Sequence, residues 1–442
     1  MLNSAVQFGP TEELVRHISA VKDEPAWMLD LRLNALRLWQ ETPMPTWGPD
    51  LSGLDFSGMS YFADPLVDEQ YSWSGVPKEI KQTFIDLGIP EAEREYLGGV
   101  GAQFDSGSVY HHLKATLEAK GVLFENMDTA VEKYPELVRE YFMTSCVAIG
   151  EHKFAMLHAA CWSGGTFIYV PKGVTVELPL QAYFRMNKMH SAQFEHTLII
   201  ADEESSITYI EGCSAPQYTA SSLHAGCVEI FVKRNAAVRY ISVENWSKNT
   251  FNLNTKKAII GADARMTWVG GNMGSKVSML YPSSVLLGDR GKSEALSVVV
   301  AGAGQVQDVG AKVIHIGKDT SSMIRSKSIS KDGGISHYRG LVKILPMAIG
   351  ATTHVQCDGL LLDNNSISSA LPVYKIENAH THAAHEARVG RVDMEALFYA
   401  KSRGLSEAEA IRMLVGGFVA PIAAALPLEY AIEFNRLLDL EF

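Results

Sequence analysis

The sequence lacks the short motifs that most often identify a metal site, a redox centre or a membrane segment. It has five cysteines, but no two of them form the C-x-x-C pair of structural zinc sites and thioredoxin-like centres. No apolar run approaches the ~18 residues of a membrane helix, and no basic segment followed by an apolar core opens the chain. We therefore expect a cytoplasmic protein, without a membrane partner, whose cysteines stay reduced.

Signals for nucleotide and nucleic-acid binding are missing as well. Residues 291–293, Gly-Lys-Ser, end like a P-loop, but Leu286 occupies the position of that loop's first glycine. Gly99 and Gly101 begin a dinucleotide-binding pattern that Phe104 interrupts. The formal net charge of −11 argues against a nucleic-acid partner, because such proteins carry a basic face. If ATP takes part in the function, another chain must bind it.

What the sequence does have is enough apolar material for a large core, since 47% of its 442 residues are hydrophobic. Apolar residues recur at helical spacing near both ends. The pattern predicts a helical region over 1–160 and another over 379–442, on either side of a β-rich region over 161–378. The expected helices span 12–17, 27–39, 77–87, 128–142, 394–401, 406–415 and 426–438.

Two of these helices begin at residues suited to satisfy free backbone N–H groups. Asp128 or Thr129 suits the N-cap of the helix over 128–142. Ser406 and Glu409 have the spacing of a capping box, in which each side chain bonds the backbone of the other residue. The sequence therefore predicts a helix that starts directly after Ser406.

The central region consists of short β-rich runs separated by polar turns. The runs at 197–200 and 207–210 flank one such turn, and those at 228–232 and 238–243 flank another. Paired runs start roughly 8–10 residues apart, which fits strands of ordinary length. Many runs are apolar without alternation, as buried stacked strands are. The pattern predicts a sandwich, a barrel or an irregular β-solenoid, and it leaves sandwich and solenoid equally open.

The densest group of metal-capable side chains stands at the end of the β-rich region. It comprises His380, His382, His385 and Glu386. On one helical turn, His382 would share a face with His385 or Glu386. A polar loop with imidazoles facing solvent is the alternative interpretation.

Each cysteine can also be interpreted as a buried core thiol, because free cysteine is among the most buried residue types. Cys146, Cys161 and Cys227 stand in apolar contexts that favour this interpretation. Cys357 follows small and polar residues, and taken alone it too is more often a core thiol. Cys213 stands where Gly and Pro mark the end of a strand. We expect it to be more accessible than a thiol in mid-strand.

A set of short segments, spread in order over nearly the whole chain, carries a family resemblance. They are PAWML (25–29), RLNA (32–35), GTFIYVPKG (165–173), YIEGCSAP (209–216), IHIGK (314–318), YRGLVK (338–343), QCD (356–358), HEA (385–387), LFY (397–399) and LPLE (426–429). Together they resemble the SufB/SufD family of the SUF iron–sulfur cluster assembly system, and in particular its SufB branch. The resemblance implies a right-handed parallel β-helix with α-helical regions at both ends.

The resemblance also implies a route for sulfur. Cys213 matches the family cysteine that receives sulfur from the donor machinery. Positions that match an internal sulfur path are Arg185, Glu244, Trp246 and Lys256. Glu244 is a departure, since the better-known bacterial members have Gln there. A carboxylate in such a path needs a proton or a cationic partner, for example Lys256.

The nascent cluster would be bound at Cys357, with Glu386 and His385 as further ligands, close to a second β-helix subunit. Thiolate, imidazole and carboxylate groups all bind iron, and an incomplete ligand set can release its product. Ala384 is a second departure, because it stands where those bacterial members have another Glu.

The implied function is that of an assembly scaffold, not an enzyme. It would build a transient iron–sulfur cluster, with ATP entering only through a SufC-like ABC ATPase docked on the helices around 398–416. A SufD-like paralogue or a second copy of this chain would complete the complex, and participation of a reduced flavin is left open. A SufD-like subunit is the alternative, although the presence of both Cys213 and Cys357 favours SufB. A carbohydrate-active β-helix enzyme is opposed by the scattered carboxylates.

Overall fold

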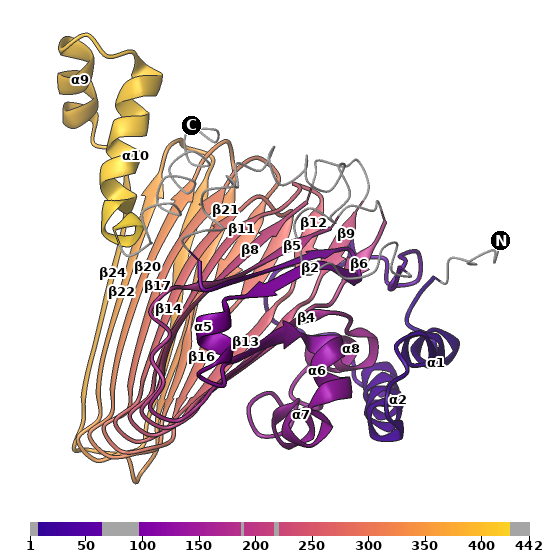
Figure 1. Ribbon diagram of the computed structural model, residues 1–442. Helices are drawn as coiled ribbons and strands as arrows, with labels where there is room; N and C mark the ends of the chain where they lie inside the picture. Colours follow the sequence, from indigo (N-terminus) through magenta and orange to yellow (C-terminus); the bar gives the residue numbers. More distant parts are fainter. Residues whose placement is uncertain (1–7, 64–96, 187–189, 216–220, 425–442) are drawn as a thin grey trace.

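The computed structural model describes residues 8–63, 97–186, 190–215 and 221–424. In these ranges, short strands stack in parallel into a β-helix, and α-helices lie toward both ends of the chain (Figure 1). The parallel β-helix implied by the family resemblance is therefore confirmed, and the sandwich is excluded.

One wall of the β-helix, the first sheet, has ten strands among the described residues. Its strands pair in parallel from coil to coil, except for an antiparallel pair at its start. In order across the sheet they are β2 (Gly107–Leu113), β1 (Gly99–Phe104), β5 (Leu180–Arg185), β8 (Ser206–Ser214), β11 (Ala237–Asn245), β14 (Arg265–Met273), β17 (Lys292–Ala301), β20 (Ser321–Ser330), β22 (Thr352–Leu361) and β24 (His382–Arg391).

The other walls form a second sheet, in which two stacks of strands join at the long strand β21 (Ile335–Ile344). One stack consists of β3 (Leu123–Asn126), β4 (Gly165–Val170), β7 (His196–Ala201), β10 (Cys227–Val232), β13 (Thr255–Ile260), β16 (Ser283–Leu286) and β19 (Lys312–His315). The other consists of β6 (Ala192–Gln193), β9 (Ser222–His224), β12 (Thr250–Asn252), β15 (Val277–Leu280) and β18 (Val306–Val309), and β23 (Ile367–Ile376) pairs with β21.

The interior between the walls is filled by side chains that repeat from coil to coil. Tyr209, Tyr240 and Trp268 occupy one register position on successive coils. Their ring centroids lie 5.7 and 5.2 Å apart along this series, within the range of favourable aromatic pairs. Register thus places equivalent residues of neighbouring coils in contact.

Tight turns lead the chain into the strands of the first sheet. Asn235, Asp263 and Asp319 have φ angles of 58°, 58° and 54°, in the left-handed region. Asn and Asp tolerate this conformation because their short side chains bond to the nearby backbone. The turns predicted before the runs at 238–243 and 266–269 are confirmed.

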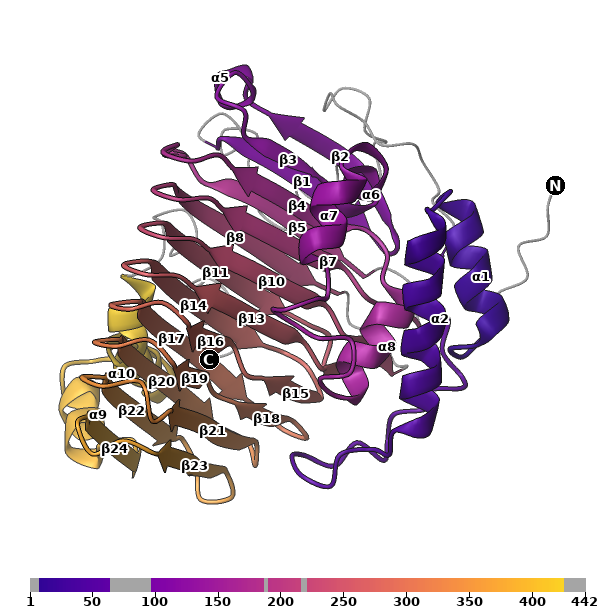
Figure 2. The same cartoon turned by 90° about the horizontal axis from the view of Figure 1, so that it is seen from below.

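A layer of N-terminal helices covers the outer face of the second sheet (Figure 2). Their side chains pack there against residues of β4, β7 and β10, including Phe167, Leu198 and Phe231. The helices described in this part of the chain are α1 (Glu12–Val21), α2 (Ala26–Glu41), α5 (Ala115–Glu118), α6 (Met127–Lys133), α7 (Pro135–Tyr141) and α8 (Lys153–Cys161).

The single helix predicted over 128–142 is wrong. Two helices, α6 and α7, meet at Tyr134, because Pro135 has no N–H with which to continue the first helix. The N-cap of α6 is Asn126, whose side chain accepts from the Asp128 N–H. Neither Asp128 nor Thr129 takes that position.

At the other end of the chain, α9 (Met394–Ser402) and α10 (Glu407–Ala423) form a helical pair. The predicted capping box is confirmed, since Ser406 and Glu409 each bond the backbone of the other residue. Figure 1 shows α9 beside the N-terminal part of α10, away from the sheets.

The helix α10 is held against the outer face of the first sheet. Its apolar residues Val415, Val419 and Ile422 belong to one buried cluster with strand residues of β17 and β20, among them Val298 and Ile329. The Lys327 ammonium lies 4.3 Å from the centre of the Phe418 ring, a cation–π contact between β20 and α10. Movement of α10 would therefore act directly on these strands.

Strands extend beyond both expected limits of the β-rich region. Strands β1, β2 and β3 precede residue 161, and β24 follows residue 378. His382, His385 and Glu386 therefore lie on a strand, and the expectation of a shared helical face is wrong. The helices predicted over 77–87 and 426–438 lie outside the described residues.

Candidate functional site

Cys213 lies near the end of β8, with its side chain in the interior of the β-helix. Parallel register places it beside Phe184 of β5 and Glu244 of β11. Because side chains alternate between the faces of a strand, Cys213 shares the inward face with Tyr209 and Glu211. Only 2% of Cys213 is exposed, so the expectation of an accessible thiol is wrong. The strand continues through the point where the sequence suggested a turn.

Acidic side chains surround this thiol. Glu211 Oε1 lies 3.9 Å from Cys213 Sγ and accepts a hydrogen bond from the Tyr240 hydroxyl at 2.6 Å. Glu195 and His224 form a buried ion pair, and each offers a ligand atom within 4.8 Å of Cys213 Sγ. Burial raises the pKa of Cys213, and the neighbouring carboxylates raise it further. The resting form is therefore the neutral thiol.

Lys256 offsets part of this negative charge. Lys256 Nζ lies 2.7 Å from Glu244 Oε1 and 4.0 Å from Glu211 Oε1, and all three side chains are buried. Trp246 Nε1 and Asn252 Nδ2 donate to Glu244 Oε2 at 3.2 and 2.6 Å. Burial alone would raise the pKa of Glu244, but the positive charges beside it, Lys256 foremost, lower it. Lys256 is thus the cationic partner that a carboxylate at this position needs.

The second cysteine lies near the last coil of the β-helix. Cys357 of β22 stands between Ser326 of β20 and Ala387 of β24. Its Sγ atom lies 3.6 Å from His385 Nε2. Burial raises the pKa of Cys357 to about 12, although the neighbouring Tyr338 hydroxyl opposes this, and burial lowers the pKa of His385. A neutral thiol and a neutral imidazole therefore face each other, a pair that binds iron once the thiol loses its proton.

A column of small side chains lies between the two cysteine regions. Register aligns one inward-facing residue of each coil in the series Glu211, Ser242, Gly270, Ser297, Ser326 and Cys357. Ser297 Oγ donates to Ser326 Oγ at 3.0 Å. A cavity of about 40 Å³ lies along this column, with Lys256, Ser242, Gly270 and Ser297 in its lining. We call its four middle members, Ser242, Gly270, Ser297 and Ser326, the small-residue column.

Two family descriptions match this sequence. "SUF system FeS cluster assembly, SufBD core domain" covers residues 184–418, and "SufBD protein N-terminal region" covers residues 104–182. Relatives described as iron–sulfur cluster assembly SufBD family proteins include those of Staphylococcus haemolyticus (strain JCSC1435), 52% identical, and Staphylococcus aureus (strain MRSA252), 51% identical. Each comparison spans 433 residues, 98% of this chain and 93% of the relative. The chain belongs to the SufBD family.

Membership in the SufBD family means that this protein takes part in iron–sulfur cluster assembly by the SUF system. The family descriptions treat SufB and SufD together, so the family alone does not separate the two branches. The iron–sulfur cluster is the product of that system, and the thiol and imidazole groups of Cys357 and His385 are types of ligand that bind iron. No helix in the described ranges is long and apolar enough to cross a membrane.

Two residues expected at the sites of this SufBD protein lie apart from them. Arg185 of β5 donates to Ser214 Oγ at 3.1 Å, and its register position adjoins that of Cys213 on the opposite face of the strand. Glu386 pairs in register with Gln356, so it lies on the face opposite Cys357. Its side chain is 48% exposed. Cys357 and His385 are brought together within one chain, whereas Glu386 is not brought to them.

Several residues of the site carry no recognisable motif in the sequence. Glu195 and His224 are 29 residues apart, as are Glu211 and Tyr240, and both pairs are in contact. This separation is about one coil of the β-helix, so the contacts become visible once the coil length is known. The signal in the sequence that could have identified these residues is the recurrence of polar residues at intervals of about one coil.

Proposed function

We propose that this SufBD protein is a SufB-like scaffold, not itself an enzyme, on which sulfur and iron are assembled into a transient cluster. The observation that carries the proposal is the placement of Cys213 and Cys357 on the same interior face, joined by the small-residue column. A SufD-like subunit that only supports the complex would need neither the two thiols nor the space between them.

The first step would be sulfur transfer to Cys213 from a donor persulfide. Glu211 takes the thiol proton, and burial raises the pKa of Glu211, which makes it a stronger base than an ordinary carboxylate. The Cys213 thiolate then attacks the outer sulfur of the donor. A new S–S bond forms as the donor's S–S bond breaks, and the donor leaves as a thiolate, so no net oxidation occurs. Because Cys213 is 2% exposed, the donor reaches it only through a local opening.

The second step would carry sulfur through the β-helix to the cluster site. Lys256 borders the cavity and offers a positive charge to an anionic persulfide close to Cys213. The small-residue column offers the remaining route to Cys357. Conversion of persulfide sulfur to sulfide takes two electrons, which a reduced flavin bound elsewhere would supply. Cys357 and His385 would then bind the nascent iron–sulfur cluster.

The exposed last coil supports a partner at the cluster site. The apolar side chains of β23 that lie on the surface include Leu371, Val373 and Ile376, which are 41, 45 and 44% exposed. A second β-helix, either a SufD-like paralogue or another copy of this chain, would cover them. Such a partner would also provide the ligands that Cys357 and His385 lack. Glu386 would act on the outer side of this junction.

The helical pair α9 and α10 supports docking of an ATPase. Met394, Phe398 and Tyr399 of α9 are 71, 74 and 60% exposed, an unusual concentration of apolar and aromatic surface. A SufC-like ABC ATPase would bind there, and ATP would act only through that partner.

The test is anaerobic cluster assembly on this chain co-expressed with its ATPase. With iron and free sulfide, wild type and Cys213→Ala should both develop the iron–sulfur absorbance, and Cys357→Ala should lose most of it. With a persulfide donor in place of sulfide, Cys213→Ala should fail as well. Normal assembly by Cys357→Ala under both conditions would refute the scaffold role and favour the SufD-like alternative.

The small-residue column can be tested at Gly270. A Cβ atom at this position meets Ser242 Oγ at 3.8 Å, an ordinary contact, so Gly270→Ala should transfer sulfur normally. Gly270→Leu should fill the cavity and reduce persulfide-dependent assembly about tenfold or more, with sulfide-dependent assembly retained. Equal persulfide-dependent rates for the two variants would rule out this route.

A further inference from the structure

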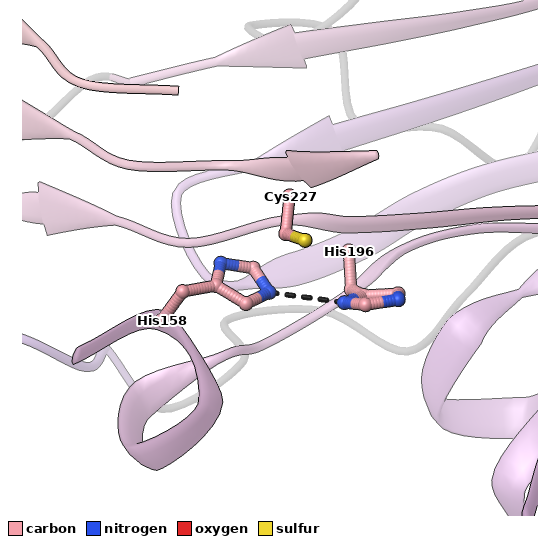
Figure 3. Close-up of side chains that lie close together, drawn as sticks. All are labelled: His158, His196 and Cys227. Atoms are coloured by element: carbon pink, nitrogen blue, oxygen red, sulfur yellow. Dashed lines mark hydrogen bonds between the residues drawn. The ribbon is translucent and has the colours of Figure 1, made fainter. Parts of the chain in front are cut away.

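A group of metal-capable side chains lies outside the β-helix interior and plays no part in the proposed function. His158 of α8, His196 of β7 and Cys227 of β10 meet between the N-terminal helices and the outer face of the second sheet (Figure 3). All three are at most 1% exposed. His196 and Cys227 are register partners on adjacent strands, which explains why their side chains lie together.

The three ligand atoms are close enough to share one ion. His158 Nε2 lies 3.0 Å from His196 Nδ1, and one ligand atom of each of the three residues lies within 4.8 Å of the others. Figure 3 shows both rings and the Cys227 sulfur turned toward a common point. Two imidazoles and a thiolate are a donor set that zinc prefers.

A neighbouring carbonyl orients one imidazole ring in the way that metal ligands are held, and a carboxyl group lies beside the other ring. His158 Nδ1 bonds the Ala225 carbonyl at 2.8 Å, which leaves Nε2 for an ion. His196 Nε2 lies 3.2 Å from Glu229 Oε2, which leaves Nδ1 for the same ion. Glu229 is itself fixed, because it accepts the N–H groups of Met143 and Val147 at 2.7 and 2.8 Å.

Without an ion, this arrangement leaves a polar atom poorly satisfied. If His196 carries its proton on Nε2, the two facing nitrogens both present lone pairs 3.0 Å apart. If the proton is on Nδ1, the bare Nε2 faces the Glu229 carboxyl group instead. Among the described residues, His196 Nε2 makes no well-aligned hydrogen bond, although it is fully buried. Buried groups of this kind carry a cost that a bound cation removes.

We propose that His158 Nε2, His196 Nδ1 and Cys227 Sγ bind one zinc ion, with Glu229 and the Ala225 carbonyl as outer hydrogen-bond partners. Zinc–ligand bonds of about 2.0–2.3 Å would separate the two nitrogens to about 3.3 Å. The Cys227 thiolate would offset part of the charge of the buried ion. A water or small ligand would take the fourth position. The ion would join α8 to two strands of the second sheet.

The experiment measures zinc in the full-length protein produced with zinc in the medium and dialysed against a weak chelator. Wild type should retain about one zinc per chain. The zinc content of Cys227→Val and of His158→Gln should each be at least about tenfold lower. Cys161→Val is the matched control, because Cys161 is a fully buried thiol of the same helix α8 outside the group, and it should retain zinc. Circular dichroism checks that each variant has folded.

Cobalt gives an independent measurement of the ligand set. Cobalt-loaded wild type should show the visible bands of a tetrahedral site and a thiolate-to-cobalt charge-transfer band, and Cys227→Val should lack the latter. Cys357→Ala should keep both signals, so failure of cluster assembly leaves this test intact. Wild-type zinc below about a tenth of an ion per chain, or equal zinc in wild type and Cys227→Val, would overturn the proposal.

Discussion

The two cysteines on the interior face occupy opposite environments within one β-helix. Cys213 lies among charged groups in the middle coils, where Glu211 and Lys256 are both fully enclosed. Cys357 has the neutral neighbours Tyr338 and His385 and lies one strand from the exposed last coil. The enclosed middle coils keep Cys213 away from solvent, with Lys256 as a cation nearby, whereas a position next to the exposed last coil permits release. The difference suits the roles that we propose for the two sites, receipt of sulfur at Cys213 and release of the cluster at Cys357.

The largest expected effect comes from removing the cation of the Cys213 region. Lys256→Met leaves two buried carboxylates, Glu244 and Glu211, without their partner, and we expect a loss of about 3–5 kcal/mol in unfolding free energy. Urea unfolding followed by circular dichroism measures it. Lys257→Met is the matched control. Lys257 pairs with Glu151 where both side chains are partly exposed, so its loss should cost about 1 kcal/mol or less. Equal losses would contradict the enclosed ion pair.

A smaller effect should appear in the pH dependence of stability. The folded-state pKa of Glu244 lies below its ordinary value of 4.5. Its contribution to stability is therefore complete above that pH and is lost as the pH falls through the folded pKa. Glu244→Gln should lower stability at pH 7 by about 1–3 kcal/mol. The loss is smaller than for Lys256→Met because Lys256 still has the Glu211 carboxylate beside it. Below pH 4.5 the difference from wild type should shrink, and a constant difference from pH 7 to pH 3 would be inconsistent with this pair.

The two thiols should also differ in reaction with iodoacetamide. Both are buried, and burial raises the pKa of each, so neither reacts quickly in the closed state. The last coil has a strand neighbour on one side only, so its local opening should cost less than opening the middle coils. Cys357 should therefore be labelled at least about tenfold faster than Cys213, as measured by peptide mass spectrometry. Faster labelling of Cys213 than of Cys357 would refute this difference in local opening.

The smallest effect on stability is expected at Glu386. Its ion pair with Arg388 joins side chains that are 48 and 74% exposed, so Glu386→Gln should change the unfolding free energy by less than about 0.5 kcal/mol. If Glu386 acts at the junction with a partner subunit, the same variant should still lose cluster in the co-expressed complex. Arg388→Gln is the control for loss of the ion pair alone and should keep the cluster.

The sequence predicts the strands of this protein much better than their arrangement. The runs at 207–210 and 238–243 lie within β8 and β11, because apolar and β-branched residues favour strands in any β-sheet fold. The choice of a β-helix came from the family resemblance, since run length is the same in a sandwich. The single helix over 128–142 failed because Pro135 was given too little weight.

The site residues show a similar limit. The direction of Cys213 depends on whether the strand ends before or after it, and a single residue of difference changes its face. Glu386 was expected beside Cys357 because the resemblance implies that both belong to the cluster site, yet register places them on opposite faces. The group of His158, His196 and Cys227 spans α8 and two coils, so no spacing in the sequence could have indicated it.

The contact between α10 and the first sheet gives the molecule the form of a lever. The helix α10 packs on β17 and β20 through Val298, Ile329 and the Lys327–Phe418 contact. The part of this lever that a partner can reach is α9, which stands clear of the sheets. The inward residues of the same two strands are Ser297 and Ser326 of the small-residue column. A protein that grips and turns α9 would therefore strain the walls of the interior space without entering it.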